Sequence, residues 1–210
     1  MFLKTASDID LESRIEAGKK DLEEKFKTNF ETQEQTLSVI IKAVNYSKHN
    51  NLASNKLIWN TAGYLNITGY DLKIIGRELF FSTNEWQKRY FSRQACLLIY
   101  ELTNDIPSLL GRNFRSELNK LSDASTLAME LNSITKSISD YKKDNNERLK
   151  NIRNFSVAHR DKDIFEQLSV IESIQWNEVI EYVTKFDDIM NDLGQFLQRV
   201  VQKSVSELDK

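Results

Sequence analysis

Residues that form turns are scarce in this sequence. Its 210 residues include one proline, Pro107, and six glycines. Folds rich in β-structure need many turn residues, so this scarcity favours long helices. The remaining composition, with 40% hydrophobic and 29% charged residues, is that of an ordinary globular protein with enough chain for one domain and a sizeable core.

Cysteine and histidine are also scarce. The chain has one cysteine, Cys96, and two histidines, His49 and His159. A single cysteine forms no internal disulfide, and a structural zinc site usually takes four Cys or His ligands. A di-metal helical bundle needs Glu-x-x-His pairs, but Tyr46 and Ser156 stand three residues before the two histidines. We therefore predict no metal and no cofactor, and we interpret Cys96, which lies among apolar residues, as a small buried hydrophobe.

Long hydrophobic runs are absent from the chain. The most apolar stretches, such as 72–81, contain charges and are far shorter than the roughly 20 residues of a membrane helix. Residues 1–10 contain no apolar run of signal-peptide length. We expect a cytoplasmic protein with no membrane partner. Phosphate-binding loops, dinucleotide-binding loops, nucleophile elbows and zincin motifs are missing too, which removes the main sequence support for the enzyme classes that carry them.

Apolar residues recur at helical spacing through most of the chain. The pattern predicts helices over 7–48, 54–81, 85–105, 113–121, 124–157 and 176–205, with a turn and a short element between the last two. Asn84 and the pair Ser122-Asp123 are predicted to cap helices, and Pro107 is predicted to end one. The glycines within 54–81 indicate either close packing or a break near Thr68-Gly69.

No internal repeat, low-complexity segment or linker divides the chain. We therefore predict a single all-α domain over 1–210, a bundle of long helices in which 1–48 is one long helix that packs on the core or extends from it. The three tryptophans are interpreted as core or helix-end packing, at Trp59, Trp86 and Trp176.

One short run, 151–162, contains residue types that are suited to catalysis. It reads Asn-Ile-Arg-Asn-Phe-Ser-Val-Ala-His-Arg-Asp-Lys, so that Arg153 is followed by the polar Asn154 and, after five residues in all, by His159. This run resembles the signature of the HEPN superfamily, and Ala158 before the histidine resembles its abortive-infection-type members, as does the Arg160-Asp161 pair. The resemblance implies a four-helix core with extra helices and a metal-independent endoribonuclease, of the kind found as toxins or phage-defence components with an antitoxin protein as partner.

The chemistry of these side chains agrees with that function. Histidine suits proton transfer, because its ordinary pKa of about 6.5 is near neutral pH. Arginine stays charged and donates paired hydrogen bonds to phosphate oxygens. We therefore expect His159 to be the acid and base, Arg153 to stabilise the phosphate, and Asn154 to position either group. Arg160 and Asp161 are expected to support them.

The resemblance also implies a polar or acidic residue from an earlier core helix. Glu101 is the candidate, since it follows Leu97, Leu98 and Ile99 in an otherwise apolar stretch. A carboxylate there is costly to bury unless it is paired, and Arg153 is the expected partner, although Glu101 facing solvent remains open. The weaker alternatives are Asn104 and Asp105.

Local charge favours an acidic ligand beside the motif. The chain has a net charge of −2, but the stretch 142–162 has seven basic and three acidic residues, whereas 163–210 has four basic and ten acidic residues. We expect Arg148, Lys150 and Lys162 to contact RNA, although a solvated helix with mixed charges explains the same pattern.

The spacing of the motif adds a geometric constraint. Six helical steps from Arg153 to His159 turn through roughly 600°, so the two side chains do not share a face of an unbroken helix. Either the helix bends or ends near 157–159, or the two groups work across a dimer. The resemblance favours the dimer, because HEPN proteins commonly pair through this face, and we expect a homodimer with RNA as its partner.

Two other hypotheses remain open. The chain could be a non-catalytic HEPN-like scaffold that binds RNA or protein, or an unrelated helical interaction protein whose surface is its long N-terminal helix. The Arg-Asn pair is not diagnostic by itself, since Arg112-Asn113 repeats it without a following histidine.

Overall fold

The computed structural model describes residues 5–154 and 164–207, and α-helices form nearly all of both ranges. The all-α class predicted from the sequence is therefore confirmed. The helices of these ranges are α1 (Ala6–Ala17), α2 (Lys19–His49), α3 (Ala53–Phe81), α4 (Glu85–Leu109), α5 (Arg112–Leu118), α6 (Ala124–Arg153), α7 (Ile164–Glu172) and α8 (Trp176–Glu207).

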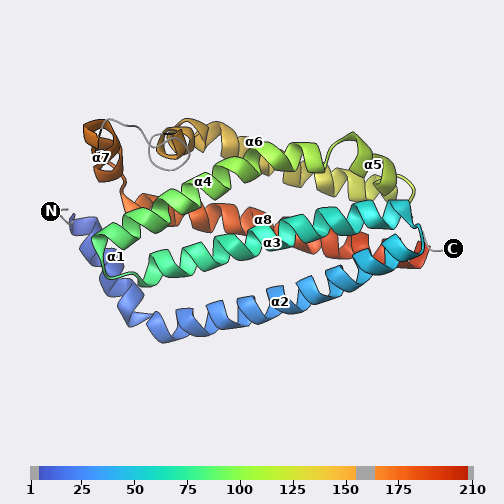
Figure 1. Ribbon diagram of the computed structural model, residues 1–210, viewed down its shortest axis with the longest axis horizontal. Coiled ribbons are helices and arrows are strands. Elements are labelled where there is room, and N and C mark those ends of the chain that lie inside the picture. Colours follow the sequence, from blue (N-terminus) through green and yellow to red (C-terminus); the bar gives the residue numbers. More distant parts are fainter. Residues whose placement is uncertain (1–4, 155–163, 208–210) are drawn as a thin grey trace.

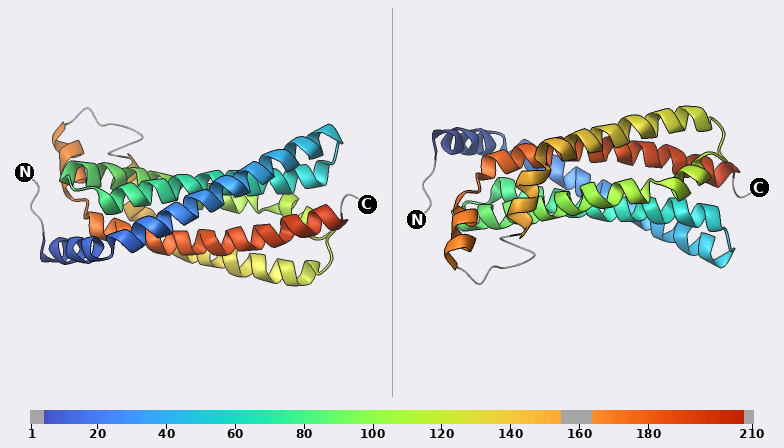
Figure 2. Two further views of the ribbon diagram at one scale, coloured as in Figure 1. Left: turned by 90° about the horizontal axis from the view of Figure 1, so that it is seen from below. Right: turned by 90° about the horizontal axis from the view of Figure 1, so that it is seen from above.

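Four long helices form the centre of an elongated bundle. Helix α3 packs against α4 and α8, and α4 also packs against α6 and α8. Helix α2 packs along α3 on the outside of this group, and the two ends of the chain lie at opposite ends of the bundle (Figure 1). Seen from below, α2 crosses the bundle diagonally, from the side of α8 to the side of α3 (Figure 2, left).

The core is continuous along the bundle. Side chains from all four central helices are fully buried there, with Leu72 of α3, Ile99 of α4, Leu131 of α6 and Phe186 of α8 each fully excluded from solvent. Cys96 also lies in this core, which confirms the interpretation of its thiol as a small hydrophobe. Burial raises the pKa of the Cys96 thiol from 9.0 to about 12.

The N-terminal helix is not continuous, so the prediction of one helix over 7–48 was wrong. Helix α1 ends at Ala17, and α2 begins at Lys19 after Gly18. Glycine is the weakest helix former after proline, so the break falls where helical continuation is least favoured. Thr5 and Asp8 begin α1 with a reciprocal capping box, which makes this short helix a separate unit.

Helix α3 runs unbroken through Thr68-Gly69, so its glycines serve close packing instead. A Cβ added at Gly63 would lie 3.1 Å from Ile40 of α2, and one at Gly76 would lie 3.3 Å from Val183 of α8. Both distances are tighter than most Cβ contacts, so a side chain at either glycine would require the neighbouring residue to shift by a few tenths of an ångström.

Two predictions about helix ends differ from the structure. Helix α4 continues past Pro107 to Leu109, because a proline in the last turn costs few intrahelical hydrogen bonds. Asn84 does cap α4, accepting a 2.8 Å hydrogen bond from the Trp86 backbone N–H. Asp123 does not cap α6 with its side chain; its backbone is left-handed and its carboxylate pairs with Lys203 of α8 at 2.9 Å. The described part of α6 ends at Arg153.

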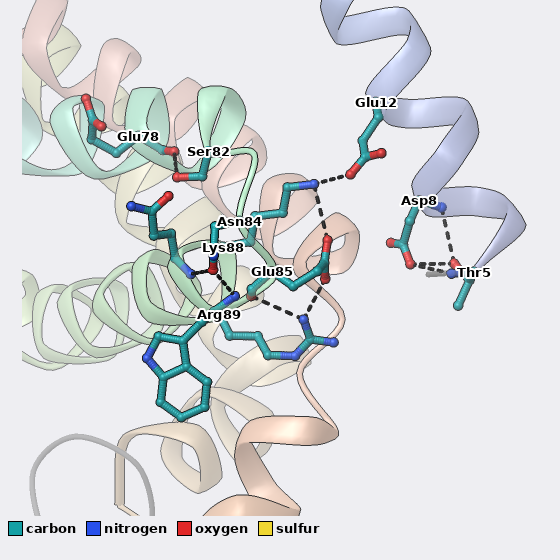
Figure 3. Close-up of polar contacts among 11 residues, drawn as sticks. Thr5, Asp8, Glu12, Glu78, Ser82, Asn84, Glu85, Lys88 and Arg89 are labelled. Atoms are coloured by element: carbon teal, nitrogen blue, oxygen red, sulfur yellow. Dashed lines mark hydrogen bonds and ion pairs between the residues drawn. The ribbon is translucent and has the colours of Figure 1, made fainter. Parts of the chain in front are cut away.

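A buried ionic cluster fastens α1 to the bundle (Figure 3). Lys88 of α4 is 2% exposed and pairs with Glu12 of α1, while its ammonium lies 3.5 Å from Glu85. The same ammonium lies 3.9 Å from the centre of the Trp176 ring at the start of α8. Arg89 donates to the Glu85 carboxylate at 2.6 Å. These contacts join α1, α4 and α8. The buried ammonium of Lys88 therefore links the three helices at a position where apolar side chains usually pack.

Candidate functional site

Arg153 lies at the last position of α6, where its guanidinium meets α4. Its Nε donates to Glu101 Oε1 at 2.9 Å, and its Nη1 donates to Asn154 Oδ1 at 3.1 Å. The guanidinium carbon lies 5.3 Å from the centre of the Tyr100 ring. A guanidinium has five N–H donors, so these contacts hold Arg153 in place without using all of its donors on the described residues.

Two expectations for Glu101 can be compared with this geometry. The ion pair with Arg153 is confirmed. The question of whether Glu101 is buried or faces solvent is answered by its side chain, which is 43% exposed. Helix α4 turns Ile99 and Leu102 inward, which leaves Glu101 at the surface beside the end of α6. The arrangement is a partly exposed cation held by a carboxylate at the rim of the core.

The two alternatives to Glu101 pair with other residues. Asn104 accepts a 2.7 Å hydrogen bond from Lys142 of α6, and Asp105 accepts a 2.7 Å hydrogen bond from the Tyr64 hydroxyl of α3. The bond to Asp105, together with burial, raises the pKa of Tyr64 from 10.0 to about 12. Asn104 and Asp105 therefore lie on α4 beyond Glu101, and neither of these hydrogen bonds involves Arg153.

The basic residues of α6 border an open surface depression. It is lined by two carboxylates, Asp144 and Glu147, and by Arg148, Lys150, Asn151 and Asn154. Lys150 is exposed, whereas Arg148 donates to the Ser173 carbonyl at 2.8 Å and so ties α6 to the segment before α8. The lining combines both signs of charge, with Asn154 shared between the depression and Arg153.

Four of the predicted site residues lie outside the described residues: His159, Arg160, Asp161 and Lys162. The structure therefore brings together Arg153, Asn154 and Glu101 of the predicted set, and places Lys150 and Arg148 one to two turns earlier on α6. The choice between a bent helix and a dimer for bringing Arg153 near His159 stays a prediction.

An aromatic face on α4 was missed by the sequence analysis. Trp86 and Tyr90 are 46% and 45% exposed, and Trp86 lies in the first turn of α4, so of the two interpretations, core or helix-end packing, the structure leaves the helix end for Trp86. The guanidinium carbon of Arg93 lies 5.7 Å from the centre of each ring. The i,i+4 spacing of two aromatic residues around a run of cations is the signal that could have found this face.

A second surface feature is an apolar groove between α2 and α8, with α3 as its floor. The groove has a volume of about 660 Å³ and runs past Val39, Trp59, Leu65, Leu197 and Val205. The charged residue of its described lining is Lys73. Because the Lys73 ammonium is paired with Asp187 of α8, it does not favour an anionic ligand in the groove. Helix α2 lies beside α8 near the N-terminal end of α2 and diverges from α8 toward the C-terminal end of α2 (Figure 2, left).

Two other kinds of site are absent from the described parts of the chain. Within 5–154 and 164–207, no three His, Cys, Asp or Glu side chains gather in a way that could hold a metal ion. No helix in those ranges has both the length and the apolar composition to cross a membrane. Searches against protein-family models, curated proteins and solved structures find no match to the chain.

Proposed function

We propose that this chain is a HEPN-like, metal-independent endoribonuclease, a cytoplasmic toxin or phage-defence component that acts as a homodimer and has an antitoxin protein as a partner. The observation that supports the proposal is the anchored but partly exposed guanidinium of Arg153, held by Glu101 and Asn154 at the end of a basic helix. Because the guanidinium is already fixed in position, it loses little further conformational entropy when it binds an anion.

The proposed reaction needs no group beyond these side chains and the RNA. His159 takes the proton of a 2′-hydroxyl, the 2′-oxygen attacks the neighbouring phosphorus, and the bond to the 5′-oxygen breaks. The departing 5′-oxygen receives a proton from the protonated histidine, which leaves a 2′,3′-cyclic phosphate and a 5′-hydroxyl end. Arg153 stabilises the charge that develops on the phosphate oxygens, and Asn154 fixes the orientation of Arg153. Lys150, Lys162 and Arg148 attract the RNA backbone.

The experiment is incubation of RNA with the purified protein in the presence of a chelator. Wild type is expected to cleave, and Arg153→Ala and His159→Ala are each expected to lower the rate by at least about 100-fold. Arg112→Ala is the matched control, because Arg112 is an exposed arginine before an asparagine at the start of another helix. Cleavage that persists in both site variants would overturn the assignment.

The second candidate function is a non-catalytic scaffold, and the apolar groove favours it. Among the described residues that line the groove, Lys73 is the one with a charge, and it is already paired with Asp187, so the fitting occupant is an amphipathic helix with an uncharged apolar face. RNA that stays intact with wild type, together with loss of partner-helix binding in Val39→Glu, would favour the scaffold over the nuclease.

A further inference from the structure

We infer that Trp86 and Tyr90 form a stacking platform for unpaired bases of RNA whose phosphate is held at Arg153. This inference deepens the proposed function and rests on it. It names the substrate class as single-stranded RNA, and it assigns a binding role to two residues of α4 outside the Arg-Asn-His motif.

Trp86, Tyr90 and Glu101, the residue of α4 that holds Arg153, lie on one face of α4. Trp86, Tyr90, Leu97 and Glu101 are separated by four, seven and four residues, a spacing that keeps side chains on the same side of a helix. Tyr90 and Glu101 are eleven residues apart, or roughly 16 Å along the axis. Arg153 is fixed on Glu101, so a strand with its phosphate there reaches the rings within a few nucleotides.

The rings are held ready for stacking. The Arg93 guanidinium carbon lies 5.7 Å from each ring centre while Arg93 itself is only 8% exposed, so the cation supports the rings from within. Tyr90 also packs edge-on against Phe91, with 5.3 Å between ring centres. Nearly half of each platform residue remains open to solvent. An anchored aromatic ring with an open surface is what base stacking requires.

Charge favours RNA over an apolar partner at this face. The three cations in the first nine residues of α4 are nearly buried, and two of them, Lys88 and Arg89, are paired with carboxylates, so the charge that attracts a ligand here comes from α6. The five basic residues at 142–153 of α6 outnumber its two acidic ones. A duplex does not expose its base faces, so the ligand that uses both the cations and the rings is an unpaired strand.

The experiment follows tryptophan fluorescence during titration with a short 2′-O-methylated single strand, which lacks the attacking hydroxyl. Trp59 and Trp176 are buried, so quenching by bases reports on Trp86. Trp86→Ala and Tyr90→Ala are each expected to weaken binding by about 5- to 150-fold, whereas Trp86→Phe keeps the affinity and loses the signal. Tyr46→Ala, which removes an exposed tyrosine of α2, is the matched control and is expected to bind as wild type does. Fluorescence anisotropy of labelled RNA measures the affinities independently of the signal.

The outcomes separate this inference from the nuclease proposal. Equal binding of a duplex, or of the same strand with abasic sites, would overturn the platform while cleavage in chelator still supports the nuclease. Loss of self-association in Trp86→Ala, with unchanged RNA affinity, would show that this face binds another copy of the chain and would also overturn it. Quenching with the predicted losses supports the platform even where no cleavage is seen.

Discussion

Neutralising Glu101 tests how the site holds Arg153. In the unliganded structure the carboxylate of Glu101 binds the guanidinium that the proposal gives to a phosphate. The two anions therefore compete for one cation. Glu101→Gln removes the competing charge but keeps a side-chain oxygen that accepts the hydrogen bond from Arg153 Nε, so the position of the guanidinium is preserved while its attraction for phosphate increases.

The magnitude follows from the exposure of the pair. The side chains of Arg153 and Glu101 are 27% and 43% exposed, so solvent screens their attraction. Partly exposed pairs of this kind contribute at most about 1 kcal/mol to folding. We expect Glu101→Gln to lower the free energy of unfolding by no more than about 1 kcal/mol and to tighten RNA binding by up to about 5-fold.

The assay combines RNA binding at fixed salt with urea unfolding of the same proteins. Fixed salt is essential, because binding to phosphates depends steeply on ionic strength. Glu101→Ala is the matched variant: it removes the charge and the acceptor together, so it should bind RNA but cleave it more slowly than Glu101→Gln. Equal or weaker RNA binding by Glu101→Gln than by wild type would refute competition for Arg153.

Three further predictions concern stability and reactivity. Lys88→Ala should lower the free energy of unfolding by about 3 kcal/mol in urea, because it breaks a buried ion pair, whereas Lys185→Ala, which removes an exposed lysine, should change it by less than about 0.5 kcal/mol. Cys96 should react slowly with a thiol reagent at neutral pH until urea unfolds the protein, because burial raises its pKa to about 12. The raised pKa of Tyr64 favours its neutral form in the folded state, so the stability from its bond to Asp105 is present below about pH 10 and is lost as the pH rises toward about 12; Tyr64→Phe should flatten unfolding profiles there.

Those parts of the structure that depend on local pattern were predictable. Helical spacing placed the long helices, and a carboxylate among apolar neighbours indicated the pairing of Glu101 with Arg153. Asn84 capped its helix as expected, because the cap depends on the next few residues alone.

The parts that depend on distant partners were not predictable. From the sequence, Trp86 is interpreted as core or helix-end packing, but the inner face of α4 at this end is filled by Lys88, Arg89 and Arg93. Lys88 tolerates burial because Glu12 of α1 and Trp176 of α8 surround it, and both are remote in sequence. A local sequence pattern does not indicate partners that are remote in the chain. The sequence analysis therefore missed that the cations are buried and that Trp86 and Tyr90 are exposed.

The most direct measurement of the central claim is the chemistry of the RNA ends after cleavage in chelator. The account predicts 2′,3′-cyclic phosphate and 5′-hydroxyl ends from wild type, no cleavage at a site whose 2′-hydroxyl is replaced by hydrogen, and loss of these products with Arg153→Ala. Cleavage of the deoxy-substituted site, or unchanged products from Arg153→Ala, would contradict it.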